Sequence, residues 1–230
     1  MLYVDLMGSF RVLISSILYF IGTFLLIPSC VLFLPFGNYV AGVLILISAC
    51  CFLTLAAALD VVYVLFIEHS SGKCMLASVF MLAGGILFLS AAVFYYPQGD
   101  VGGMDCVILG TWVFRIGSLC YLGGSCSSLL VLHESIPSQS QYAQQDYERG
   151  LLHSVDSNPA PAGRAETSRR WWLLVVYLFI IGALLYILGG VFSQYLSMPL
   201  PGVVAWIIGS VFFVSGAFVQ LWEVVRSWND

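Results

Sequence analysis

Two ionisable side chains stand inside strongly apolar stretches of the chain, and they are the first candidates for chemistry. Asp60 lies late in the apolar stretch 39–67, and Arg115 lies early in the stretch 106–132. A charged residue at the centre of a membrane helix costs about 2.5–3.5 kcal/mol on insertion scales, so such residues mark ligand or ion sites by default. Arg115 and Asp60 are therefore the candidate intramembrane polar residues.

No catalytic, cofactor-binding or metal site is predicted beside them. The three histidines, His69, His133 and His153, have no cysteine or histidine partner at a metal-ligand spacing. The chain contains no nucleophile elbow, no zinc-protease motif and no phosphate-binding glycine loop. Its basic residues form no patch for nucleic acid. We expect a protein that is not an enzyme.

Composition and length indicate which elements hold these residues. Hydrophobic residues make up 60% of the 230 positions and charged residues 9%, where a soluble domain has about 25% charged residues. A helix of about 20 apolar residues crosses the hydrocarbon core of a bilayer. The first stretch is longer than the apolar part of a signal peptide, so we expect it to be retained. The sequence predicts an all-α polytopic membrane protein with six transmembrane helices, near 12–35, 39–67, 76–96, 106–132, 171–193 and 202–225.

Small residues recur every seven positions in each of these stretches. Seven residues make two turns of a slightly underwound helix, so each series lies along one narrow seam. Close approach of backbones is a main source of helix association in lipid. The predicted seams are Ser15/Gly22/Ser29, Gly42/Ala49/Ala56, Ala77/Gly84/Ala91, Gly110/Gly117/Gly124, Gly182/Gly189 and Gly202/Gly209/Gly216.

The seams align as three copies of one helical hairpin. Gly22 aligns with Gly84 and Gly182, and the second helices of the hairpins align through their own small residues. Chance matches among common membrane residues are the alternative to a true internal repeat. The predicted organisation is a first hairpin at 1–68, a second at 69–132, a linker at 133–170 and a third hairpin at 171–230.

The central hairpin resembles a known family. Residues 109–118 read LGTWVFRIGS, which is similar to the second-helix signature of the YrhK-like domain, and residues 84–88 read GGILF, which resembles its first helix. Residues 205–210 repeat the pattern more loosely. The resemblance implies a two-helix membrane module and supplies no catalytic residues. Arg115 inside the motif and the inserted linker depart from the simple family pattern.

Basic residues predict the orientation. Seven of the eight Lys and Arg residues fall at the N-terminus, in the second and fourth connections and at the C-terminus. The positive-inside rule then places both termini and the linker 133–170 in the cytosol. The linker is rich in Ser, Gln, Ala and Pro, so we expect disorder there, with a short surface helix at 142–152 as the alternative.

The hairpin alignment also predicts partners for the polar residues. Asp60 is too deep to meet Arg115, for which we expect snorkelling to headgroups or pairing with carbonyls and hydroxyls such as those of Tyr95 or Thr23. Asp60 aligns with Ser128 and Gln220. Two arrangements stay open for these three residues, a hydrogen-bonded ring or separate polar side chains at helix ends.

Two other pairs of residues could also interact. Glu223 and Arg226 are expected to form an exposed ion pair, and a disulfide between Cys30 and Cys106 is left open.

These observations favour a structural or protein-interaction role within the lipid bilayer. Cytosolic partners would bind through 133–170. The alternative is a small transporter or channel with a pathway between the hairpins, although few polar residues line the helices. A four-helix protein with two accessory helices is a third interpretation.

Overall fold

The computed structural model describes residues 2–65, 72–96, 105–134, 162–194 and 199–229. Each of its six long helices contains an apolar segment of 22 to 29 residues, which is long enough to cross a membrane. The prediction of an all-α, six-helix integral membrane protein is confirmed. The helices are α1 (Leu2–Leu32), α2 (Tyr39–Tyr63), α3 (Gly72–Tyr95), α4 (Cys106–Glu134), α6 (Ala162–Gln194) and α7 (Pro199–Asn229).

Local chemistry marks several helix starts. The side chain of Asn38 caps α2 by accepting a hydrogen bond from the Ala41 amide at 3.1 Å. Asp105 Oδ1 accepts a hydrogen bond from the Val107 amide at 2.8 Å and caps α4 in the same way. Helix α7 begins with Pro199. Proline has no amide hydrogen, and the first residue of a helix has no use for one because its amide has no acceptor within the helix.

The last hairpin begins earlier than the sequence predicts. Helix α6 starts at Ala162, so residues 162–170 belong to a helix and not to the linker. This segment contains Ala, Arg and Glu, which favour helix even where apolar residues are few. The rest of the linker, 135–161, lies outside the described residues, as does the predicted alternative helix at 142–152.

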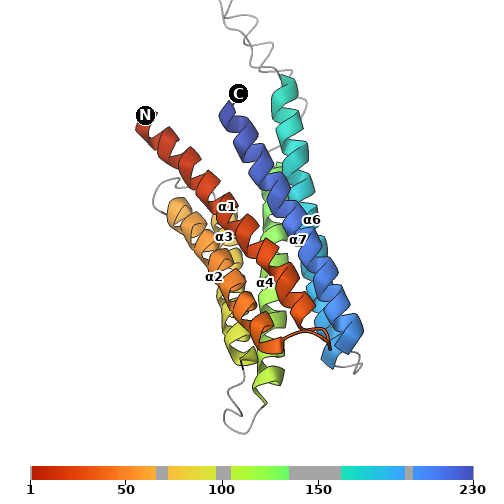
Figure 1. Ribbon diagram of the computed structural model, residues 1–230. Coiled ribbons are helices and arrows are strands. Elements are labelled where there is room, and N and C mark those ends of the chain that lie inside the picture. The colour runs from red at the N-terminus through yellow and green to blue at the C-terminus, as the bar shows by residue number, and fades with distance from the viewer. Residues whose placement is uncertain (1, 66–71, 97–104, 135–161, 195–198, 230) are drawn as a thin grey trace, which may run out of the picture.

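The six helices form a closed ring. Each helix packs against its neighbours in the order α1, α2, α3, α4, α6 and α7, and α7 packs against α1 to complete the ring (Figure 1). Contacts are most extensive within the pairs α1–α2, α3–α4 and α6–α7. This pairing is compatible with three repeated hairpins. Both termini lie at one end of the ring (Figure 1), and we call the half of the bundle at that end the terminal half and the other the distal half.

Glycines face the partner helix within each pair. A Cβ atom on Gly84 would lie 2.5 Å from Tyr121 Cδ2, and one on Gly209 would lie 2.7 Å from Tyr186 Cδ2. Neither site has room for a larger residue without a shift of a buried ring. The glycines that closely approach the other helix of their own pair are Gly22, Gly42, Gly84, Gly110, Gly117, Gly124, Gly182, Gly189, Gly202, Gly209 and Gly216.

The outside of the ring is apolar, as a lipid-facing surface requires. Large hydrophobic side chains such as Phe24, Leu44, Leu119 and Phe218 each expose more than half of their surface. Bilayer hydrocarbon accepts such side chains because it is as apolar as they are.

Candidate functional site

The centre of the ring in the terminal half holds a cavity of about 310 Å³, which we call the central cavity. All six helices contribute to its wall, through residues such as Tyr19, Asp60, Ser78, Ser128, Trp172 and Gln220. The wall is mostly apolar and carries a few polar groups, which is the usual character of a small-molecule site.

Aromatic rings close the cavity on its distal side. Phe88, Phe114, Tyr121, Tyr186 and Phe213 form a continuous cluster that we call the aromatic layer. Centroid separations are 4.6 Å for Phe88–Phe114, 5.0 Å for Phe88–Tyr121 and 5.4 Å for Phe114–Tyr186. Beyond it lies a void of about 10 Å³, no larger than one water needs. The layer therefore separates the central cavity from the distal end.

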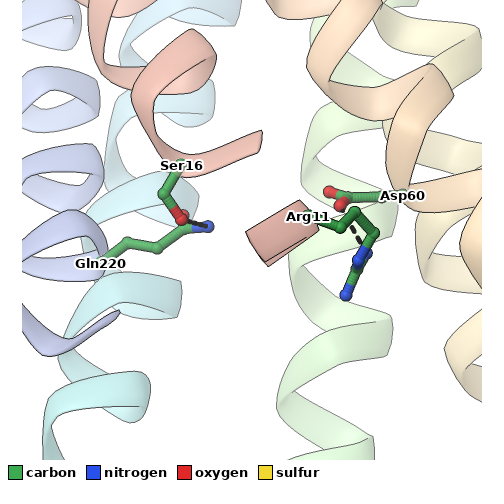
Figure 2. A network of polar contacts seen from close by, with 4 residues as sticks. All are labelled: Arg11, Ser16, Asp60 and Gln220. Atoms are coloured by element: carbon green, nitrogen blue, oxygen red, sulfur yellow. Dashed lines mark hydrogen bonds and ion pairs between the residues drawn. The ribbon is translucent and has the colours of Figure 1, made fainter. Parts of the chain in front are cut away.

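Asp60, a sequence-predicted site residue, lines the cavity and is paired with Arg11. The Arg11 guanidinium donates to Asp60 Oδ1 over 2.8 Å (Figure 2), and it also lies 3.8 Å from the centre of the Tyr63 ring. The two charged side chains keep 22% and 27% of their surface exposed. The ion pair thus offsets the cost of a carboxylate at membrane depth and remains accessible.

Sequence reasoning missed Arg11 as the partner, although the seam spacing contains the signal. Gly22 packs against Ala49, which sets the register of the antiparallel pair α1–α2. Equal steps of eleven residues, backward from Gly22 and forward from Ala49, lead to Arg11 and Asp60. Residues at equal steps from a crossing point of antiparallel helices lie at the same depth.

Ser128 and Gln220 line the same cavity as Asp60, but the three do not bond to one another. Gln220 Nε2 donates to Ser16 Oγ over 3.2 Å, and Ser128 Oγ donates to the carbonyl of Gly124 on its own helix over 3.0 Å. Figure 2 shows the Ser16–Gln220 and Arg11–Asp60 contacts as separate from each other. Helix α1 contributes one residue to each contact and is thereby linked to both α7 and α2.

Arg115, the second predicted site residue, lies away from the cavity and links two hairpins. Its side chain is 7% exposed and donates to the carbonyl of Gly190 on α6. A Cβ atom at Gly190 would lie 2.8 Å from Arg115 Nε, so the glycine makes room for the guanidinium. Pairing with a carbonyl was one expectation, but the partner is Gly190. Tyr95 instead donates to Thr111, and Thr23 donates to the carbonyl of Tyr19.

Two buried hydroxyls face the cavity without a hydrogen-bond partner among the described residues. Tyr121 is 5% exposed and Ser125 is 1% exposed, and both line the central cavity. A buried polar group without a partner is costly. Water, or a guest with one polar atom, would supply the missing hydrogen-bond partner. Periodicity along the sequence does not single out these two residues as site residues.

Two expectations about other residues are corrected. The expected exposed Glu223–Arg226 pair is wrong, because Glu223 is only 8% exposed whereas Arg226 faces outward. Glu223 shares the inward face of α7 with Gln220 and the buried Val224. All seven cysteines lie in the described part of the chain, and none forms a disulfide. Cys30 instead lies 3.7 Å from the hydroxyl of Ser210.

Comparison of the chain with protein-family models, curated proteins and solved structures gives no match. The resemblance to the YrhK-like domain therefore stays a prediction, and the interpretation of the site depends on its own geometry.

Proposed function

We propose that this integral membrane protein has a non-enzymatic binding role and holds a small, largely apolar molecule in the central cavity. The observation that carries the proposal is a wall built from all six helices around about 310 Å³. This volume is at the lower end of the range for ligand pockets, about 300–1,000 Å³. This role differs from the structural or protein-interaction role predicted from the sequence, and the cavity is what supports it.

The positive-inside argument supports an orientation for this site. The terminal half carries Arg11, Arg169, Arg170 and Arg226, so we propose that the cavity lies on the cytosolic side. A guest would enter from the cytosol or from the adjoining lipid leaflet. Binding of cytosolic partners through 133–170 remains a separate part of the proposal.

Titration of the protein in nanodiscs with 4-phenylbutanol tests the binding role. We expect saturable uptake of one molecule per chain above that of empty nanodiscs. A ligand present at 100 times its Kd raises the free energy of unfolding by about 2.7 kcal/mol. Ser128→Trp fills the cavity and should weaken binding at least tenfold. Leu130→Trp is the matched control on the same helix, because Leu130 is 59% exposed to the outside. Uptake equal to that of empty nanodiscs would contradict the proposal.

Transport is the second candidate, and one observation favours it. The cavity lies between the hairpins, as a transport pathway would, and its wall includes Asp60, Ser128 and Gln220. The aromatic layer must open for a solute to cross. Flux into proteoliposomes that Asp60→Asn abolishes would establish transport, whereas saturable binding without flux would support the binding role alone.

A further inference from the structure

We infer that the guest of the central cavity is an organic cation with an apolar body, and that Asp60 is its counter-charge. The inference rests on the proposed binding role. Among the described residues of the wall, Asp60 alone carries a formal charge. No described lysine or arginine lines the cavity to offset that charge from within. Asp60 is therefore the group of the wall that can attract a cation, by sharing its carboxylate with Arg11 or exchanging it for the guest.

Asp60 already binds a cation in the structure. Arg11 donates to Asp60 Oδ1 over 2.8 Å and lies over the ring of Tyr63. Arg11 is not part of the cavity wall, whereas Asp60 is, so the carboxylate is the member of this ion pair that a guest in the cavity meets. A carboxylate has two oxygens and can face two cations at once, and its charge attracts a quaternary ammonium, which has no N–H to donate, as well as a guanidinium. A guest ammonium reaches Asp60 from the cavity and either shares the carboxylate with Arg11 or replaces it.

The remaining wall suits the same chemistry. Six aromatic side chains line the cavity: Tyr19, Phe88, Tyr121, Trp172, Phe179 and Phe213. Aromatic faces attract cations and are the usual recognition surface for quaternary ammonium groups, while they also accept an apolar body. The hydroxyls of Tyr121 and Ser125 add two polar atoms deeper in the wall. A carboxylate and aromatic rings in one cavity wall match a cationic head on an apolar body.

Three probes with the same phenylbutyl body test the charge preference: 4-phenylbutyltrimethylammonium, 4-phenylbutanol and 5-phenylpentanoate. Each is titrated into the protein in uncharged nanodiscs, and its dissociation constant is measured by calorimetry. We expect the ammonium to bind at least tenfold more tightly than the alcohol and the carboxylate to bind most weakly. Asp60→Asn should bring the ammonium to the affinity of the alcohol. Arg11→Gln should tighten ammonium binding severalfold, because it removes a like charge, and should leave the alcohol unchanged.

Two further variants keep the test decisive. The double variant Arg11→Gln/Asp60→Asn retains a neutral hydrogen-bonding pair if Asp60→Asn alone does not fold, and it should also lose the preference for the ammonium. Glu223→Gln removes a buried carboxylate of α7 that does not line the cavity, and it should change the ammonium affinity less than twofold.

The outcomes separate this inference from the proposed binding role. Equal binding of ammonium and alcohol, or an ammonium affinity that the double variant leaves unchanged, overturns the inference and leaves the binding role intact. Tightest binding of the carboxylate overturns it as well. Failure of all three probes to bind overturns the inference and the binding role together.

Discussion

The distal half of the ring is filled by aromatic side chains, whereas in the terminal half the same six helices surround a cavity of about 310 Å³. Helix packing alone does not explain the difference, because the glycine seams run through both halves. The aromatic layer places five rings at the centre. The wall of the cavity shares three of these rings, those of Phe88, Tyr121 and Phe213, but it also includes four small residues, Ala77, Ser78, Ser125 and Ser128.

A second contrast separates the hairpins within the core. Aligned positions carry Leu26 in the first hairpin, Phe88 in the second and Tyr186 in the third, and all three belong to one core cluster. Leu53, Tyr121 and Phe213 form a second such set. The first hairpin therefore contributes smaller side chains to the centre than the other two. Side-chain size on the inner faces decides where a ring of six helices is solid and where it is hollow.

The largest expected effect comes from opening the aromatic layer. Phe114 is 6% exposed and does not line the central cavity, so Phe114→Ala should lower the free energy of unfolding by about 3 kcal/mol. Phe179 lines the cavity and is only half-buried, so Phe179→Ala should cost less than half as much. Thermal unfolding in detergent measures both. Equal losses would mean that the two halves are packed alike.

Adding a methyl group to a seam should have the next largest effect. Gly209→Ala places Cβ 2.7 Å from the fully buried Tyr186 ring, so we expect overpacking to lower the free energy of unfolding by about 2 kcal/mol. Gly123→Ala is the matched control, because its nearest atom outside its own helix would lie at 3.6 Å, an ordinary contact. Helix propensity then makes that change neutral or stabilising. An unchanged melting temperature for Gly209→Ala would count against close packing at the seam.

Arg115→Leu tests whether that residue acts within the bundle or on a ligand. Loss of its hydrogen bond to the Gly190 carbonyl should lower the free energy of unfolding by about 1 kcal/mol. The decrease is this small because the substitution also removes a charge from membrane depth, which is stabilising. Binding of the probes in the central cavity should not change, because Arg115 does not line it. A tenfold change in ammonium affinity would instead place Arg115 in the binding machinery.

The smallest expected effect is at the junction that closes the ring. Gln220→Leu removes the hydrogen bond to Ser16 that links α7 to α1, and such bonds average about 0.6 kcal/mol in membrane proteins. Ser215→Ala on the same helix is the control, because Ser215 bonds only to the Val211 carbonyl of α7 among the described residues. Unfolding in detergent by a chemical denaturant resolves the difference. A loss several times larger would show that the α1–α7 junction holds the ring closed.

Much of the fold could be predicted because its signals are local in the sequence. Runs of apolar residues predict the six helices, and their lengths follow from the thickness of a bilayer. The start of α6 could not be predicted from hydropathy, because the helix continues into residues that are polar. The burial of Glu223 was missed for a similar reason: polarity along the chain does not say which face of α7 turns inward.

The sequence by itself determined the helix count, the placement of both termini on one side and the glycines that permit close packing, because each depends on residue type and spacing along the chain. The tertiary structure alone decided that α7 closes on α1, that Arg115 lies against Gly190, and that Asp60 faces a cavity beside Arg11. These features join segments far apart in the chain, and they depend on the sizes of side chains from all three hairpins that meet at the centre.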